Sequence, residues 1–106
     1  MAHAPGTSPC WSVYLVRRSD GALYAGIATD PERRLVAHRA GTGAKALRGR
    51  GPLTLVWSVG VGDRGLAQRV EAQLKRLPKD QKEQLVASAR FARSFLGAAT
   101  GPVQPR

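Results

Sequence analysis

The amino-acid sequence predicts an α+β domain, in which three to four helices flank one small, mainly antiparallel sheet of three strands. Two observations support this prediction. The chain has 106 residues, a length that suits a single hydrophobic core. Runs of aromatic and β-branched residues are interspersed with segments whose apolar residues recur every three or four positions. The predicted order is two strands, a helix, a short basic segment, a third strand and two further helices.

The first two strands are predicted to form a β-hairpin. Residues 11–18 and 22–27 are rich in strand-forming side chains, and the Ser-Asp-Gly sequence between them is typical of a turn. Two registers are open. A two-residue Asp-Gly turn pairs Ser19 with Ala22, so the numbers of paired residues sum to 41. A three-residue loop with a left-handed Gly21 pairs Arg18 with Ala22, and the numbers of paired residues then sum to 40.

The register decides which side chains share a face of this hairpin. The three-residue loop is favoured because it collects one apolar face, and a slip of one residue would mix the two faces. That apolar face consists of Trp11, Val13, Leu15, Leu23, Ala25 and Ile27. In the same register Tyr14 pairs with Gly26. Tyr14 and Tyr24 then share the second face of the hairpin, opposite the apolar one. The glycine leaves space where the backbone of a ligand can approach.

The first helix is predicted to begin after Asp30, its N-cap, with Pro31 in the first turn. It is expected to end at Gly41, a residue suited to a helix C-terminus. The basic stretch at 43–51 is expected to be a short helix or a loop. The third strand is predicted over residues 53–59, which are rich in β-branched and aromatic side chains.

The second half of the chain is predicted to be helical. Asp63 can cap a helix that continues to Leu77, because its apolar residues recur at helical spacing. Pro78 ends that helix or begins the next one. Residues 79–92 have a helical composition.

Composition also predicts the limits of the folded domain. Both ends of the chain are rich in Pro, Gly and Ala and lack periodicity. We therefore expect a disordered lead over residues 1–10, a folded domain over 11–92 and a flexible tail over 93–106.

The chain is strongly basic. Its 17 Lys and Arg residues face only 7 Asp and Glu, and the formal net charge is +10. Most of the cations are Arg, whose planar guanidinium matches phosphate oxygens in a bidentate way. Because both halves of the chain carry the same excess, the folded body itself must be basic. This distribution suggests a nucleic acid or an anionic membrane as partner.

Several other classes of protein are excluded by composition. Cys10 is the only cysteine, so no disulfide framework or cysteine-rich zinc site is expected. No apolar run approaches the ~18 residues of a membrane-spanning helix, and the N-terminus lacks a secretory signal pattern. No helix combines a broad apolar face with a cationic one, which argues against a membrane partner. We therefore expect a cytoplasmic protein.

Five residues are candidates for chemistry: Tyr14, Tyr24, Arg34, His38 and Glu71. The two tyrosines share one face of the hairpin in the favoured register. Arg34 and His38 are four residues apart on the first helix and therefore point the same way. Glu71 lies at the edge of an apolar helical stripe, where a partly desolvated carboxylate requires a cation or a metal.

Each candidate also has a purely structural interpretation. Tyrosines in strands commonly pack as amphipathic side chains, and Arg34 with His38 can form a solvated helix face. Glu71 can pair with Lys75 four residues later. The basic run can belong to a solvated loop or can contact phosphates; it consists of Lys45, Arg48 and Arg50.

Taken in order, these residues resemble the signature of the GIY-YIG nuclease family, most closely its small stand-alone bacterial members. The first motif, Gly-Ile-Tyr, appears as Ser12-Val13-Tyr14, and the second, Tyr-Ile-Gly, as Tyr24-Ala25-Gly26. Arg34 and His38 match the Arg and His of the following helix, and Glu71 matches a later helical Glu. The basic segment 43–49 and the stretch Val61-Gly62-Asp63-Arg64 also look like the stand-alone subgroup. The resemblance covers about residues 11–86.

The resemblance implies a metal-dependent endonuclease that hydrolyses DNA phosphodiester bonds. The enzyme would be structure-selective or only weakly specific, and it would act in DNA repair, recombination or processing. One Mg²⁺ or Mn²⁺ would bind Glu71, with waters and a phosphate oxygen as further ligands. Tyr14 would act as general base or proton relay, its pKa lowered by Arg34, Tyr24 and the metal. Arg34 would stabilise the phosphorane charge, and His38 would position the water or share in proton transfer.

The resemblance leaves binding and partners open. Lys45, Arg48, Arg50 and Lys75 are the residues expected to contact DNA phosphates. A small domain with one site has few contacts for sequence specificity, so a homodimer or a specificity-providing protein is expected. The alternative function is a non-catalytic nucleic-acid-binding module of the same fold. One departure from the family is the absence of any Asn, which many family nucleases carry on the helix after the Glu; here Lys79 and Lys82 occupy that region.

Overall fold

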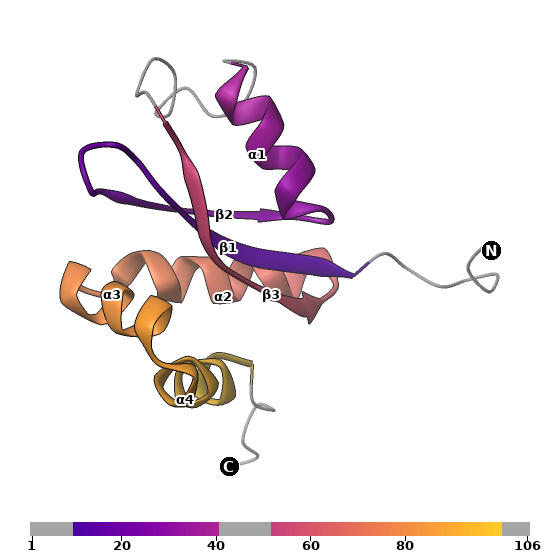
Figure 1. Ribbon diagram of the computed structural model, residues 1–106. Coiled ribbons are helices and arrows are strands. Elements are labelled where there is room, and N and C mark those ends of the chain that lie inside the picture. Colours follow the sequence, from indigo (N-terminus) through magenta and orange to yellow (C-terminus); the bar gives the residue numbers. More distant parts are fainter. Residues whose placement is uncertain (1–9, 41–51, 101–106) are drawn as a thin grey trace, which may run out of the picture.

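The computed structural model describes residues 10–40 and 52–100 of the chain. Within these residues an antiparallel sheet of order β2-β1-β3 is accompanied by four helices, so the predicted α+β class is confirmed. Helix α1 lies on one face of the sheet, and α2, α3 and α4 lie on the other (Figure 1). No described helix combines the length and the apolar character needed to cross a membrane. The elements are β1 (Trp11–Arg17), β2 (Leu23–Ala28), α1 (Pro31–Arg39), β3 (Thr54–Gly62), α2 (Arg64–Arg76), α3 (Lys79–Ala87) and α4 (Ala89–Thr100).

The hairpin of β1 and β2 has the favoured register. Tyr14 is the partner of Gly26, so the paired numbers sum to 40. The Arg18 N–H donates to the Ala22 carbonyl at 2.9 Å and closes a three-residue loop. Gly21, the last residue of that loop, has a φ of +88°, which a residue without Cβ adopts freely. The prediction from the apolar pattern is confirmed.

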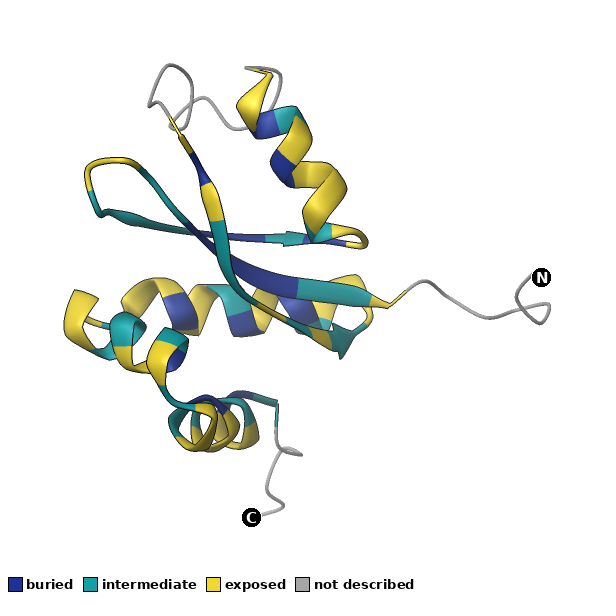
Figure 2. Cartoon of the chain, in the orientation of Figure 1, coloured by how far each residue is buried: buried dark blue, intermediate teal, exposed yellow. Residues whose placement is uncertain are grey.

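Each face of the sheet packs on its own apolar cluster. On the face of α2 the buried strand residues Val13, Leu15 and Ala25 contact buried helix residues such as Leu74 and Leu85. On the face of α1 a smaller cluster is formed by Tyr14, Val16, Ala28, Leu35 and Leu53. The buried positions therefore line both sides of the sheet (Figure 2). The two candidate tyrosines face α1, as the register requires.

The helix N-termini follow the predicted capping. The Asp30 carboxylate accepts a hydrogen bond from the Arg33 N–H at 3.2 Å, and the Asp63 carboxylate accepts one from the Leu66 N–H at 2.8 Å. Strand β3 is longer than predicted and continues to Gly62 because its pairing with β1 extends through two register shifts. The predicted helix end at Gly41 and the basic stretch 43–51 lie outside the described residues.

The C-terminal region departs from the prediction. Residues 79–92 form two helices instead of one, because Ser88 adopts an extended conformation and its hydroxyl accepts from the Phe91 N–H at 3.1 Å. Helix α4 then continues to Thr100, so the predicted flexible tail is wrong for residues 93–100. The Gly-Ala-Ala composition suggested a tail, but Ala99 is buried against the core. Residues 1–9 of the lead predicted over 1–10, and the last six residues of the chain, lie outside the described part.

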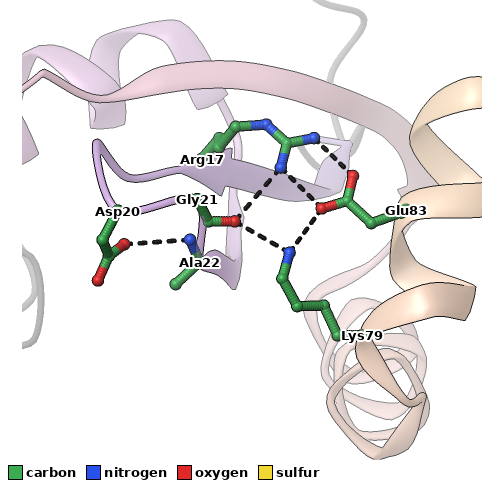
Figure 3. Close-up of polar contacts among 6 residues, drawn as sticks. All are labelled: Arg17, Asp20, Gly21, Ala22, Lys79 and Glu83. Carbon is green, nitrogen blue, oxygen red and sulfur yellow. Dashed lines mark hydrogen bonds and ion pairs between the residues drawn. The ribbon is translucent and has the colours of Figure 1, made fainter.

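A cluster of charged side chains ties α3 to the hairpin loop (Figure 3). Arg17 donates two hydrogen bonds to the Glu83 carboxylate, each 2.7 Å long. Lys79 donates to the same carboxylate at 2.6 Å, and both cations donate to the Gly21 carbonyl, at 3.0 Å from Lys79 and 3.3 Å from Arg17. Lys79 therefore has a structural contact in this part of the chain.

The charged cluster predicts an acid-sensitive contribution to stability. The hydrogen bond from Arg17, followed by that from Lys79, lowers the pKa of Glu83 from 4.5 to about 2. A depressed carboxyl pKa stabilises the fold above pH 4.5, and this contribution is lost as the pH falls through about 2. Glu83→Gln should therefore lower Tm at pH 7, and the difference from wild type should shrink between pH 4.5 and 2. Thermal denaturation followed by circular dichroism measures both.

The matched control is Glu32→Gln. Glu32 is exposed and has no ion-pair partner in the part of the chain that the structure describes, so its replacement tests the loss of one negative charge alone. A Tm difference for Glu83→Gln that stays constant across this pH range would contradict the assigned role of the cluster.

Candidate active site

A phenol and an imidazole meet between the sheet and α1. The Tyr14 hydroxyl of β1 and Nε2 of His38 on α1 are 3.1 Å apart, and both residues are almost fully buried. The ring of Tyr24, on β2, meets the His38 ring edge to face, with the ring centroids 6.0 Å apart. The hairpin register and the position of His38 on α1 bring these three rings together.

Gly26 makes this arrangement possible. Tyr14 lies across the sheet over its neighbour on β2. A Cβ added at Gly26 would lie 2.5 Å from the Tyr14 hydroxyl oxygen and 2.6 Å from Cζ, closer than real contacts allow. The glycine of the second motif is therefore required for the tyrosine of the first motif to lie where it does.

This contact predicts the effect of a single methyl group. Gly26→Ala should force the Tyr14 ring to move and should lower the free energy of unfolding by about 1–3 kcal/mol, the range typical of overpacking. Gly97→Ala is the control, because a Cβ there meets nothing within 4 Å and the residue lies inside α4. That variant should gain about 0.5–1 kcal/mol. Urea denaturation of both proteins checks the prediction, and equal stabilities would refute it.

The protonation of the pair follows from burial. Desolvation raises the pKa of Tyr14 above 10.0, and this effect outweighs the charge and hydrogen bond of Arg34, which lower it. Tyr24 and Glu71 raise the pKa further. Burial, followed by the charge of Arg34, lowers the pKa of His38 below 6.5. At neutral pH both members of the pair are therefore uncharged.

This result corrects one expectation. Arg34 does lower the pKa of Tyr14, but Tyr24 acts in the opposite direction, and the net shift is upward. The hydroxyl lies under α1, where removal of water disfavours the phenolate more than one guanidinium favours it.

Glu71 lies on α2, on the other side of the sheet from α1 (Figure 1). Its carboxylate raises the pKa of Tyr14, so the two groups lie within electrostatic range of each other although α2 and α1 cover opposite faces. The Glu71 side chain is 20% exposed, and Lys75 Nζ lies 3.5 Å from its Oε2. The i, i+4 pair expected as the structural interpretation is thus present as well. Because Lys75 is 57% exposed, this ion pair is a weak one.

Two hollows that share Arg34, Ala28 and Thr29 open to solvent near the start of α1. One, of about 280 Å³, lies along the start of α1 and includes Arg33. The other, of about 350 Å³, lies between the starts of β1 and α2 and includes Trp11 and Arg64. Arg34 lines both hollows, so it connects the buried rings to the surface. The candidate residues drawn from the sequence did not include Trp11, Arg33 or Arg64.

Comparison with known proteins agrees with this geometry. Residues 10–84 match the GIY-YIG catalytic domain. The chain belongs to the GIY-YIG family. The UPF0213 protein YhbQ of Escherichia coli K12 is 52% identical over 92 residues, which cover 87% of this chain and 92% of the relative. The YhbQ protein of Salmonella arizonae is 50% identical over 93 residues, covering 88% of this chain and 93% of the relative.

Solved structures of similar proteins also exist. A protein of E. faecalis, determined by solution NMR, is 31% identical, with a TM-score of 0.54, and the match covers 93% of this chain and 97% of that one. The UPF0213 protein BH0048 of Bacillus halodurans is 37% identical, with a TM-score of 0.47 and 87% of each chain covered. The two YhbQ proteins are small bacterial relatives of about the same length as this chain.

The GIY-YIG site contains few metal ligands. Among the described residues no group of three or more His, Cys, Asp and Glu side chains could enclose a metal ion. Glu71 offers a single, mostly buried carboxylate. Such a site fits Mg²⁺, which keeps several waters and takes phosphate oxygens as ligands, and it does not fit a caged structural zinc.

The residues expected to bind DNA divide into two groups. Lys45, Arg48 and Arg50 lie outside the described residues of this GIY-YIG chain. Lys75 lies on α2 beside Glu71, and its ammonium group is exposed.

Proposed function

We propose that this GIY-YIG protein is a divalent-metal-dependent endonuclease that hydrolyses DNA phosphodiester bonds. The enzyme would be structure-selective or only weakly specific, and it would act in DNA repair, recombination or processing. The observation that carries the proposal is the buried pair of Tyr14 and His38, 3.1 Å apart, with the exposed Arg34 beside the phenol. A proton path next to an anion-binding group is what hydrolysis of a phosphodiester needs.

Tyr14 acts in this proposal as a proton relay. Because its pKa is raised, it keeps its proton at neutral pH. It can accept a proton from the attacking water only while it passes its own proton to Nε2 of His38. His38 can accept because its pKa is lowered and the imidazole is neutral. The water oxygen then attacks phosphorus, the bond from phosphorus to the leaving oxygen breaks, and the leaving oxygen takes a proton from solvent.

Arg34 holds the phosphate in this proposal. Its guanidinium lies beside the Tyr14 hydroxyl and lines both hollows, so a phosphate oxygen bound there is close to the relay. A fixed guanidinium stabilises the negative charge that develops on the phosphate oxygens in the transition state. Tyr24, edge-on to His38, holds the imidazole in its orientation.

Glu71 is the residue that would hold the divalent ion, Mg²⁺ or Mn²⁺. Its carboxylate is mostly buried and within electrostatic range of Tyr14. The ion would polarise the phosphate and offset its charge when bound. Lys75 can contact the phosphate backbone, because its exposed ion pair with Glu71 is weak. The same role remains a prediction for Lys45, Arg48 and Arg50.

Incubation of the purified protein with supercoiled plasmid and with a branched oligonucleotide tests the proposal. Nicked or shortened products should form with Mg²⁺ or Mn²⁺ and should not form in EDTA. If the wild-type protein binds these DNAs but cleaves none of them with either metal, the proposed endonuclease activity is refuted. The alternative, a non-catalytic nucleic-acid-binding module, would then be the function.

A further inference from the structure

The hollow next to the catalytic candidates has the composition of a nucleotide site. Its lining residues come from the start of β1, the end of β2, the beginning of α1 and the beginning of α2. An aromatic ring, Trp11, and two arginines, Arg34 and Arg64, line it. Its volume of about 350 Å³ lies at the lower end of the range for small-ligand sites. An exposed hollow with two cations and an indole suits a phosphate that carries a planar base.

Arg64 is held in a defined position but is not neutralised. Its guanidinium lies over the Trp11 ring, 5.4 Å from the ring centroid. Among the described residues no carboxylate forms an ion pair with Arg64, and the neighbouring Asp63 carboxylate is occupied by the Leu66 N–H. The guanidinium donors therefore remain available to an anion from solution.

The place of Arg64 on its helix argues against a stabilising role. It is the first residue of α2, directly after the N-cap. A positive charge at a helix N-terminus opposes the helix dipole, and the first turn of α2 contains no acidic residue that would offset it. The charge of Arg64 therefore disfavours the helix slightly, which is expected of a residue that serves a ligand.

The hollow shares Arg34 with the proposed active site. Arg34 lies beside the Tyr14 hydroxyl and also lines the hollow. Arg64 and Glu71 are seven residues apart on α2, which places them on one face of the helix, roughly 10 Å apart along its axis. A strand of DNA whose scissile phosphate lay at Arg34 would therefore bring a neighbouring nucleotide into the hollow.

We propose that this hollow binds an unpaired nucleotide next to the scissile phosphate of DNA. The phosphate binds Arg64 and Arg34, and the base stacks on the layer formed by the Trp11 indole and the Arg64 guanidinium. A base inside a duplex is covered on both faces by its neighbours, so only an unpaired base can stack in this way. The inference rests on the proposed nuclease function and assigns it a substrate class, DNA with a single-stranded segment at the cleavage point.

Binding in EDTA tests the inference without requiring cleavage. The probes are a fluorescein-labelled single-stranded DNA and its perfect duplex, and the variants are Arg64→Gln and Arg69→Gln. Arg69 is an exposed arginine on another face of α2, so its replacement removes the same charge away from the hollow. Arg64→Gln should weaken single-strand binding about tenfold, and its salt dependence of log K should fall by about 0.7. Arg69→Gln should weaken single-strand binding less than Arg64→Gln does. Arg64→Gln should also weaken duplex binding less than single-strand binding.

Thermal stability separates binding from structure. Because the Arg64 charge opposes the dipole of α2, Arg64→Gln should keep or raise Tm. A lower Tm together with unchanged affinity would mean that Arg64 only packs on Trp11, and it would overturn the inference.

Tryptophan fluorescence tests the stacking itself. The chain has two tryptophans, so Trp57→Phe leaves Trp11 as the only one. In that variant single-stranded DNA should quench the fluorescence, and the duplex should quench it less. Equal effects of Arg64→Gln and Arg69→Gln, or fluorescence that single-stranded DNA leaves unchanged, would overturn the inference even if the wild type cleaves DNA. Loss of binding and quenching specific to Arg64 and Trp11, with no cleavage by the wild type, would instead refute the nuclease and keep the nucleotide site.

Discussion

Glu71→Gln should reduce DNA cleavage by orders of magnitude while the protein still folds and binds DNA. The substitution keeps the size of the side chain and removes the charge that would hold the divalent ion. In the proposed function the same carboxylate faces the DNA phosphate, so in EDTA the variant should bind DNA as well as the wild type or better. Cleavage rates in Mg²⁺ and apparent affinities in EDTA, on one branched and one linear DNA, measure both effects.

Lys75→Gln is the matched control for this result, because it removes the other half of the same ion pair. If Glu71 were only the i, i+4 partner of Lys75, both variants would lose the same small stabilisation, about 0.3–0.5 kcal/mol for an exposed pair. Cleavage would then be unchanged in Glu71→Gln. If Glu71 holds the ion, Lys75→Gln should retain catalysis and lose only affinity, whereas Glu71→Gln should lose catalysis.

The hairpin and the helix starts could be predicted because the signals are local. A slip of one residue would have exposed Leu15 or buried a charged side chain, so the apolar pattern alone selects the register that pairs Tyr14 with Gly26. Asp30 and Asp63 cap their helices through contacts that span three residues, which makes them visible in the sequence. These features also determine which face carries Tyr14 and Tyr24.

Other features depend on contacts between distant segments and could not be predicted in this way. The apolar residues of α4, such as Phe95 and Ala99, do recur at helical spacing, but its Gly-Ala-Ala end is also typical of a tail, and only packing against the core distinguishes the two. The contact of Arg64 with Trp11 joins positions 53 residues apart, and no local sequence pattern pairs the two. The upward pKa shift of Tyr14 depends on how completely α1 excludes water, which the identities of Arg34 and Tyr24 do not reveal.

Tyr14→Phe should lower cleavage about 10²- to 10⁴-fold, the range typical for loss of a positioned proton-transfer group. The variant keeps the ring that packs over Gly26 and removes only the hydroxyl that meets His38 Nε2. Loss of this hydrogen bond should lower the free energy of unfolding by about 1 kcal/mol, so the protein should remain folded. Single-turnover cleavage and urea denaturation of wild type and variant measure the two effects separately.

The pH profile of the wild type then distinguishes a relay from an ionised tyrosine. The His38 pKa lies below 6.5, so a relay that ends on neutral His38 should run at a constant rate from pH 7 to 9. It should slow only as the pH falls through that lowered pKa, where the imidazole becomes protonated and cannot accept. If Tyr14 had to ionise first, the rate would rise about tenfold per pH unit toward its raised pKa, above 10.0. A rate that climbs steadily between pH 7 and 9 would therefore refute the relay and make the Tyr14 phenolate the base.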